Sequence, residues 1–312
     1  MAPKVPTDVP GARVTILDGG TGRELLRQGA PFRQPEWSAL ALMEAPDSVR
    51  RVHESFAAAG AGVLTTNSYA VVPFHLGAAR FASDGARLAA LAGRLARAAA
   101  DTAPATCRVA GSLPPACGSY RPDLFDEKAA RPVLETLAAA LAPCVDLWLA
   151  ETLSSTAEAR LVRAVVGADP RPLWLSFTLA DEDVDPAVPR LRSGEPVEAA
   201  VAAARAAGAA AVLFNCSQPE VMAAAVERAR TAGAPAVGVY ANAFEPQGPD
   251  AAANEELTEL RRDLTPEGYL RFADEWVQRG ATIIGGCCGI GPEHIHALAA
   301  HLAPAAARSA AR

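Results

Sequence analysis

AVLFNCSQPEVMAAAVERARTAGAPAVGVYAN, residues 211–242, is the stretch that decides the fold prediction. A short apolar run (211–216) is followed by an alanine-rich amphipathic run (218–232) and then by a second apolar run (236–242). Buried parallel strands are nearly continuous apolar runs, and they need a crossover, usually a helix, between them. The stretch therefore predicts one strand–helix–strand unit.

The same unit recurs in both directions along the chain. Further strands are predicted over 13–18, 63–69, 108–113, 145–151, 172–178 and 281–286. Helices are predicted over 47–59, 84–100, 129–142, 156–166, 196–207, 218–232, 265–278 and 292–302. Eight alternations in 312 residues favour an α/β fold of the (β/α)8 TIM-barrel type, which typically takes about 250 residues. We expect a single domain over 1–312, with an ordered core over about 11–303 and a frayed tail over 304–312.

Charge and composition exclude several classes of partner. The chain has 35 acidic and 29 basic residues, a net charge of -6, so it lacks the basic excess that neutralises nucleic-acid phosphates. We find no apolar run of signal-peptide or membrane-spanning length, which predicts a cytoplasmic protein without a membrane partner. Six cysteines are too few for a disulfide scaffold of this size. Reduced thiols, or thiolates on a metal, are the expected state.

Polar residues gather at the carboxyl ends of the predicted strands. Active sites of (β/α)8 barrels are built at this face from several strand ends. A buried core does not require carboxylates there, so we expect these side chains to converge on one site. They are Asp18, Asn67, Tyr69, Ser112, Glu151, Cys216, Asn242, Cys287 and Cys288.

Three cysteines at the ends of the sixth and eighth strands suggest a metal centre. Cys216 ends one strand, and Cys287 and Cys288 lie in GGCCG (285–289), where glycines allow a sharp turn. Three thiolates and one open position form the layout of a catalytic zinc site, and soft sulfur ligands select zinc or copper(I). Spacing alone leaves two alternatives open, a vicinal redox pair and two small buried apolar residues.

Another candidate is the DGGTG turn over 18–22, which lacks the dinucleotide-binding fingerprint. The amides of Gly19 and Gly20 could bind a carboxylate while Asp18 binds an ammonium group, so the turn could hold a zwitterion. A tight turn that simply needs glycine is the alternative. Two longer connections, 180–195 and 243–264, could border this site or be solvated insertions.

The remaining thiols and imidazoles indicate no second site. Cys107 and Cys144 precede strands, at the opposite end of the barrel, and Cys117 is expected to be a spectator thiol. The five histidines are scattered over helix-like segments, and we expect them to be structural or exposed. They are His53, His75, His294, His296 and His301.

Taken together, the motifs resemble the homocysteine S-methyltransferase family, zinc-dependent barrels that methylate homocysteine to methionine. The resemblance covers nearly the whole chain. Its motifs are LDGGTGREL (17–25), the segment 35–70 from PEWSAL to TTNSYA, AGSLPP (110–115), LAET (149–152), FNCSQPE (214–220) and GGCCGIGPEHI (285–295). The combination of the NC dipeptide with GGCCG at these strand ends is highly specific.

The resemblance implies a role for each candidate residue. It implies a zinc ion, Zn2+, on Cys216, Cys287 and Cys288, with Asn242 as a further ligand in part of the family. It implies that the amino-acid group of homocysteine is held by Asp18, Glu151 and the Gly19 and Gly20 amides. It places Trp37 and Tyr69 near the methyl donor, where aromatic faces suit a cation.

The resemblance also favours one class of methyl donor. Thr152 stands where the betaine-using branch has tyrosine, and neither that branch's C-terminal arm nor a cobalamin or folate module is seen in the sequence. A sulfonium donor, S-methylmethionine or S-adenosylmethionine, is therefore expected. Selenocysteine or another small thiol as acceptor, and a non-enzymatic zinc or redox-switch protein, are the alternatives.

Overall fold

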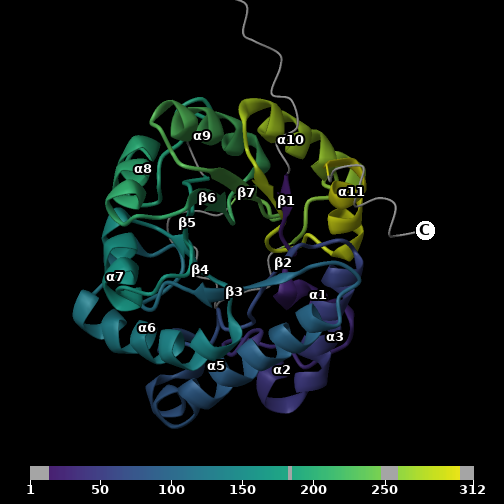
Figure 1. The fold of residues 1–312 in the computed structure, drawn as a ribbon, viewed down its shortest axis with the longest axis vertical. Coiled ribbons are helices and arrows are strands. Elements are labelled where there is room, and N and C mark those ends of the chain that lie inside the picture. The colour runs from purple at the N-terminus through teal and green to yellow at the C-terminus, as the bar shows by residue number, and fades with distance from the viewer. Residues whose placement is uncertain (1–13, 182–184, 247–258, 303–312) are drawn as a thin grey trace, which may run out of the picture.

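Eight parallel strands form one sheet at the centre of the molecule (Figure 1). The computed structural model describes residues 14–181, 185–246 and 259–302. The sheet order is β1-β8-β7-β6-β5-β4-β3-β2, so sequential strands are neighbours. The strands are β1 (Thr15–Ile16), β2 (Val63–Thr65), β3 (Arg108–Leu113), β4 (Leu147–Leu153), β5 (Leu173–Phe177), β6 (Ala211–Asn215), β7 (Val237–Tyr240) and β8 (Ile283–Ile284).

The sheet closes on itself between its first two strands. Leu17, just after β1, forms a parallel bridge with Val63 of β2. Two backbone bonds flank the bridge, from Gly62 N–H to Ile16 O at 2.8 Å and from Asp18 N–H to Val63 O at 3.1 Å. Closure brings the carboxyl ends of all eight strands around one opening. The (β/α)8 barrel prediction is confirmed.

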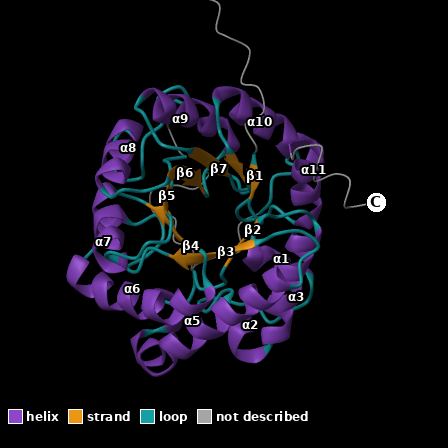
Figure 2. Cartoon of the chain, viewed as in Figure 1, coloured by secondary structure: helices purple, strands orange, loops and turns teal. Residues whose placement is uncertain are grey.

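Helices surround the strands as an outer ring (Figure 2). The crossover helices are α3 (Pro46–Ala58), α5 (Ala78–Asp101), α6 (Glu127–Leu141), α7 (Thr156–Val166), α8 (Val197–Ala206), α9 (Pro219–Thr231), α10 (Pro266–Arg279) and α11 (Pro292–Leu302). Their apolar sides pack on the sheet. They follow the predicted ranges to within two residues at each end, except that α5 begins six residues before its predicted start at 84. The ends of α7 and α11 agree with the prediction to the residue.

Three short helices were not predicted: α1 (Thr21–Arg27), α2 (Ala39–Glu44) and α4 (Pro73–Leu76). All three belong to the connections after the first two strands, and residues of α1 line the pocket described below. Several predicted strands are longer than the observed ones, because the last residues leave the ladder to face the opening. The predicted tail 304–312, residues 11–13 at the start of the predicted core and most of the 243–264 connection lie outside the described residues.

The core has two layers, one inside the barrel and one between the strands and the helices. Inside, Leu147, Leu149 and Leu213 pack with Ala110 and Trp174. The larger outer layer contains fully buried aromatic side chains such as Trp276 and Phe56. None of the helices in the described part of the chain has both the length and the apolarity needed to cross a membrane.

His53, on α3, is a buried imidazole with a predicted effect on stability. Within the described residues neither ring nitrogen has a hydrogen-bond partner, and burial lowers the pKa of His53 from 6.5 to about 4. The folded state therefore holds the neutral ring, while the unfolded chain takes up a proton as pH falls below 6.5. Stability that is present above this pH is lost as the pH falls toward 4.

We expect His53→Leu to remove this loss. The wild type should lose about 2 kcal/mol of unfolding free energy between pH 7 and pH 5 because of His53, and His53→Leu should not show this loss. Urea denaturation of both proteins at the two pH values measures the difference. The matched control is His296→Leu at an exposed position of α11. A His53→Leu difference that is independent of pH would contradict the assignment of a neutral buried ring.

Candidate metal centre and substrate pocket

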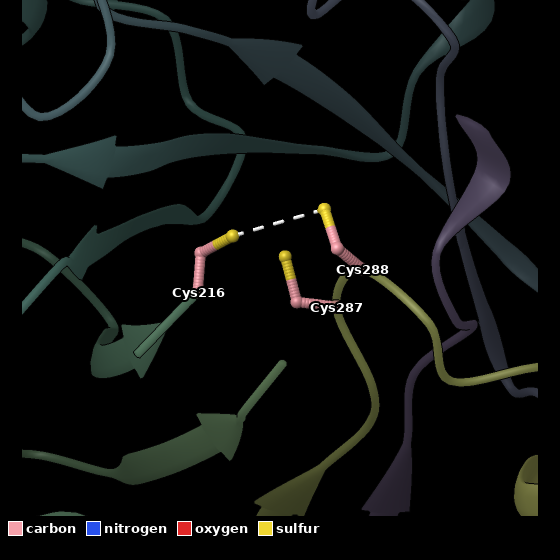
Figure 3. A group of neighbouring side chains, drawn as sticks. All are labelled: Cys216, Cys287 and Cys288. Atoms are coloured by element: carbon pink, nitrogen blue, oxygen red, sulfur yellow. Dashed lines mark hydrogen bonds between the residues drawn. The ribbon is translucent and has the colours of Figure 1, made fainter. Parts of the chain in front are cut away.

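Three thiols meet at the carboxyl end of the barrel (Figure 3). Cys216 follows β6, while Cys287 and Cys288 follow β8 after two glycines. The three sulfur atoms lie within 4.8 Å of one another, and those of Cys216 and Cys288 are 3.9 Å apart. Sulfurs on one tetrahedral zinc ion would be about 3.8 Å apart, given bonds of about 2.3 Å. The cluster has the donor atoms and the spacing of a thiolate metal centre.

The backbone around the cluster is bent in ways that bring these thiols together. Cys216 has a φ of +53°, in the left-handed region that costs most residues about 1–3 kcal/mol. Its amide donates to Tyr240 O at 3.2 Å, which holds the bend. A side chain at Gly20 would approach the carbonyl oxygen of Cys287 to 2.5 Å. Glycine is therefore required there for the first connection to lie against the cysteine turn.

The pKa values of the three thiols are shifted in different directions. The Cys287 and Cys288 thiols, together with the Tyr120 hydroxyl, donate to the Cys216 sulfur and hold the pKa of Cys216 well below its ordinary value. Hydrogen bonding to this sulfur, with burial, raises the pKa of Cys287 well above its ordinary value, and Cys288 behaves likewise. These contacts favour the anion at Cys216 over an anion at Cys287 or Cys288. A divalent cation would stabilise all three thiols as anions.

Two buried carboxylates face the same pocket. Asp18 accepts the Thr65 N–H at 2.6 Å and the Thr65 hydroxyl at 2.9 Å. Glu151, in β4, accepts the Ser112 hydroxyl at 2.5 Å and the Tyr240 hydroxyl at 3.4 Å. Burial raises the pKa of each carboxyl to about 7.

Neither Asp18 nor Glu151 has an ion-pair partner within the described residues. Buried carboxylates are normally paired with a cation, because an unpaired buried charge is costly. Their presence together beside a thiol cluster therefore indicates a cationic group on the ligand.

Aromatic rings form the outer wall of the pocket. The Trp37 ring lies edge-on to Tyr69, with centroids 5.7 Å apart, and stacks on His75 at 5.8 Å. His75 donates to Pro35 O through Nδ1 at 3.0 Å. Burial lowers the pKa of His75 to about 4, so the ring behind Trp37 is neutral. The His75 ring behind Trp37 therefore adds no positive charge to this wall.

One pocket collects the predicted residues and several that the sequence did not reveal. The predicted ones that line it are Asp18, Gly19, Gly20, Trp37, Asn67, Tyr69, Glu151, Cys216, Cys287 and Cys288. Further lining residues include Arg23, Thr65, Tyr120, Tyr240 and Phe244. Arg23 and Thr65 lie within the motifs quoted above but were not singled out, and Tyr120, Tyr240 and Phe244 lie outside them. Only the folded chain shows that all five side chains face the site.

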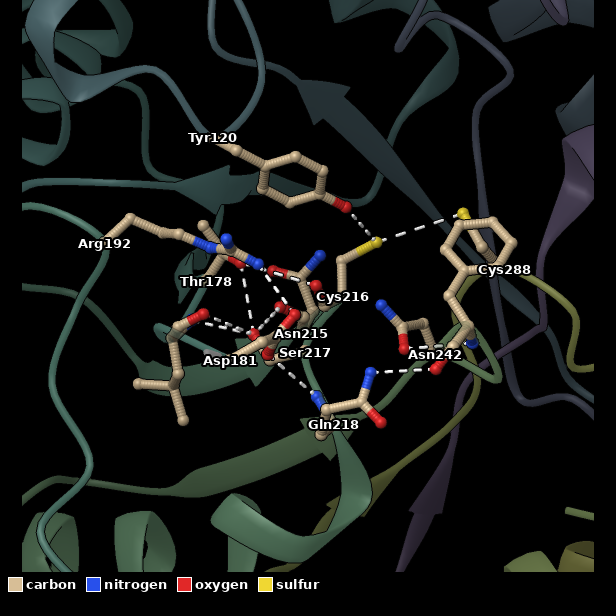
Figure 4. A network of polar contacts seen from close by, with 12 residues as sticks. Tyr120, Thr178, Asp181, Arg192, Asn215, Cys216, Ser217, Gln218, Asn242 and Cys288 are labelled. Atoms are coloured by element: carbon tan, nitrogen blue, oxygen red, sulfur yellow. Dashed lines mark hydrogen bonds and ion pairs between the residues drawn. The ribbon is translucent and has the colours of Figure 1, made fainter. Parts of the chain in front are cut away.

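Two predicted contacts need correction or more detail. The Gly20 amide donates to Ile290 O at 2.9 Å, so assigning it to a substrate carboxylate is wrong and Gly19 is left for that contact. Asn242 lies beside Cys216 (Figure 4). Within the described chain its buried Nδ2 has no hydrogen-bond partner, while its Oδ1 accepts the Phe244 N–H at 3.2 Å.

The barrel and its pocket define a class of protein: a (β/α)8 barrel whose carboxyl face carries three thiols that could hold a metal ion, two buried carboxylates and an aromatic wall. The family model described as homocysteine S-methyltransferase matches residues 15–302. The chain belongs to the homocysteine S-methyltransferase family.

Individual relatives agree with this assignment. The chain is 32% identical to homocysteine S-methyltransferase of Escherichia coli, over 92% of this chain and 94% of the relative. It is 25% identical to selenocysteine methyltransferase of Astragalus bisulcatus, over 92% and 91%. The crystal structure of the E. coli homocysteine methyltransferase MmuM in its metallated form superposes with a TM-score of 0.74 and 28% identity, covering 92% of this chain and 96% of that one.

Proposed function

We propose that this protein transfers a methyl group from a sulfonium donor to the thiol of homocysteine, giving methionine, with zinc held by Cys216, Cys287 and Cys288. The observation that carries the proposal is the cluster of three sulfurs within 4.8 Å, beside two buried carboxylates that have no ion-pair partner in the described chain. The cluster supplies a soft metal site, and the carboxylates supply a site for the ammonium group of an amino acid.

The donor set favours zinc. Three cysteine ligands suit zinc or copper(I) rather than magnesium or calcium, and three protein ligands leave a fourth position for substrate. When bound, zinc lowers the pKa of a coordinated thiol so that it is a thiolate at neutral pH. Asn242 is the proposed extra ligand when no substrate is bound, through the Oδ1 that also accepts the Phe244 N–H.

The chain's own residues then bind and orient homocysteine. Asp18 and Glu151 are proposed to hold the ammonium group, and each is already fixed by two hydrogen-bond donors. The Gly19 amide is proposed to bind the carboxylate. Fixing the amino-acid group positions the sulfur for in-line attack on the methyl group, and such positioning can supply much of the rate enhancement.

A sulfonium donor fits the outer part of the pocket. The sulfonium sulfur is positively charged before transfer and becomes a neutral thioether afterwards. The faces of Trp37 and Tyr69, together with the nearby carboxylates, favour the charged donor over its neutral product. Methyl transfer breaks the donor's carbon–sulfur bond, whose electron pair stays on the donor sulfur, and forms a new carbon–sulfur bond on homocysteine.

Trp37→Ala should weaken donor binding selectively. A cation–π contact is worth about 0.5–2 kcal/mol, which corresponds to a roughly 2- to 30-fold rise in KM for S-methylmethionine. The KM for homocysteine should stay within about twofold, and Trp37→Phe should recover part of the loss because it restores an aromatic face. Unaltered donor kinetics in Trp37→Ala would refute the assignment of this pocket to the donor. The assignment of the sulfur centre would still stand.

A second acceptor deserves a direct test because one relative is named selenocysteine methyltransferase. Selenocysteine carries the same amino-acid group as homocysteine on a side chain shorter by one methylene.

The proposal is tested by supplying homocysteine or selenocysteine with S-methylmethionine, S-adenosylmethionine or betaine, and measuring the methylated product by mass spectrometry. We expect homocysteine with S-methylmethionine to react faster than with betaine. A protein that binds zinc but methylates neither acceptor would instead support the zinc or redox-switch alternative.

A further inference from the structure

Tyr120 contacts the sulfur centre directly, although no motif singles it out. It follows β3 in the connection before the 3-10 turn Pro122–Leu124. Its hydroxyl donates to the Cys216 sulfur at 2.9 Å, and the residue is only 7% exposed. Its φ of +64° is in the left-handed region, so the local backbone bears a cost to hold the ring in this position.

A buried ion pair packs against the face of the Tyr120 ring (Figure 4). The Arg192 guanidinium carbon lies 4.5 Å from the Tyr120 ring centroid, within the range of a cation–π contact. Arg192 pairs with Asp181 at 2.8 Å, and the two side chains are 4% and 0% exposed. Both residues belong to the connection between β5 and α8, which thereby borders the site.

The same ion pair is tied to the strand end that carries Cys216. Asp181 accepts the Gln218 N–H at 3.1 Å. Close by, the Ser217 hydroxyl accepts the Leu179 N–H at 2.8 Å. The residues before Asp181 and the residues after Cys216 are thus linked by hydrogen bonds. One network fixes both the sulfur of Cys216 and the ring whose hydroxyl binds it.

We propose that Tyr120 is a positioning residue for the metal centre, donating a hydrogen bond to Cys216 as a metal-bound thiolate, and that the Arg192–Asp181 pair holds the Tyr120 ring in place. The inference rests on the proposed zinc site and extends it. Three thiolates carry more negative charge than one divalent cation neutralises. A hydroxyl donor on one of them takes up part of the excess and fixes the direction of that sulfur's lone pairs.

The test measures the metal centre rather than turnover. Tyr120→Phe removes the donor and keeps the ring. In competition with a chromophoric chelator, its zinc affinity should fall by about 10- to 100-fold. Zinc has no d–d or charge-transfer absorption in the visible range, so cobalt(II) is used as a spectroscopic substitute. Loss of the hydrogen bond raises the energy of the sulfur lone pairs, and the sulfur-to-cobalt band should move to longer wavelength.

A matched control distinguishes this role from the general loss of a buried hydroxyl. The Tyr269 hydroxyl donates to Gly285 O at 2.7 Å and to Ala241 O at 3.3 Å, and within the described chain it has no hydrogen bond to a cysteine sulfur. Tyr269→Phe should leave the cobalt band in place. Arg192→Lys, which keeps a cation for Asp181 but loses the planar group over Tyr120, should shift the band in the same direction as Tyr120→Phe and by less.

Each outcome decides a separate claim. A Tyr120→Phe protein with wild-type zinc affinity and an unshifted band overturns the role of the hydroxyl. A shifted band in Tyr120→Phe with no change in Arg192→Lys overturns the support by the ion pair. A wild-type protein that binds neither zinc nor cobalt overturns the metal site itself, and this inference with it.

Discussion

Replacing Cys287 with serine should abolish methyl transfer and remove zinc from the protein, the largest effect that we expect. Cys287 supplies one of the three sulfurs that lie within 4.8 Å of one another. Serine is a poor ligand for zinc because its hydroxyl keeps its proton at neutral pH, and two thiolates alone do not complete the site. Turnover should fall by at least about 30-fold, since only about 3% of a free thiol with a pKa near 8.5 is thiolate at pH 7. The loss should be larger still because the sulfur is no longer held in position. Cys216→Ser and Cys288→Ser should behave in the same way.

Two cysteines outside the cluster provide the control. Cys107 directly precedes β3, and Cys144 lies just before β4, so both are at the end of the barrel opposite the pocket. Cys107→Ser and Cys144→Ser should keep one zinc per chain and near-normal turnover. The measurements are the zinc content of the purified proteins and the rate of methionine formation. Full turnover in Cys287→Ser would show that the cluster does not carry the reaction.

Asp18→Asn and Glu151→Gln should impair homocysteine use while the zinc content stays unchanged. Each carboxylate is buried, lines the pocket and has no ion-pair partner in the described chain. A charge-assisted hydrogen bond to an ammonium group is worth about 1.5–3 kcal/mol, so kcat/KM for homocysteine should fall by roughly 10- to 150-fold in each variant. Steady-state kinetics at varied homocysteine concentration gives this value directly.

Glu158→Gln is the matched control for a buried carboxylate. Glu158 caps α7 by accepting the amides of Ser154 and Ser155 at 2.7 and 2.8 Å, and burial raises its pKa to about 7, as for Asp18 and Glu151. It lies outside the pocket lining. Glu158→Gln should therefore lower stability but leave the KM for homocysteine unchanged. If Asp18→Asn or Glu151→Gln lost zinc instead, the carboxylate would be a metal ligand and its proposed role would be wrong.

The architecture was predictable because it depends on repeated local patterns. Each apolar run followed by an amphipathic run is a complete strand–helix unit, and eight of them close into a barrel. β3 has its predicted ends, and so do α7 and α11. The helices α1, α2 and α4 were missed because each has only four to seven residues. Such short segments show too little periodicity to be distinguished from loops.

Site residues could be predicted where an unusual residue stands at a strand end. They could not be predicted where they lie in an irregular loop. Cys216 and the GGCCG turn stand out in the sequence. Tyr120 does not, because its hydrogen-bond partner is 96 residues away and its loop has no regular period. His75 was expected only to be structural or exposed, and its stacking on Trp37 depends on the α4 turn. The Gly20 amide was assigned to substrate because the sequence does not show that Ile290 returns to accept it.

The central claim is zinc-dependent methyl transfer from a sulfonium to homocysteine at the three cysteines. The most direct measurement supplies S-methylmethionine with deuterated methyl groups and homocysteine with a carbon-13-labelled skeleton, because donor and acceptor both yield methionine. Both are given to the protein before chelation, after chelation and after zinc is restored. Mass spectrometry should find methionine formed from homocysteine with one deuterated methyl group in the first and third samples, and almost none in the second. Equal transfer by the metal-free protein, or no labelled product with zinc present, would contradict the account.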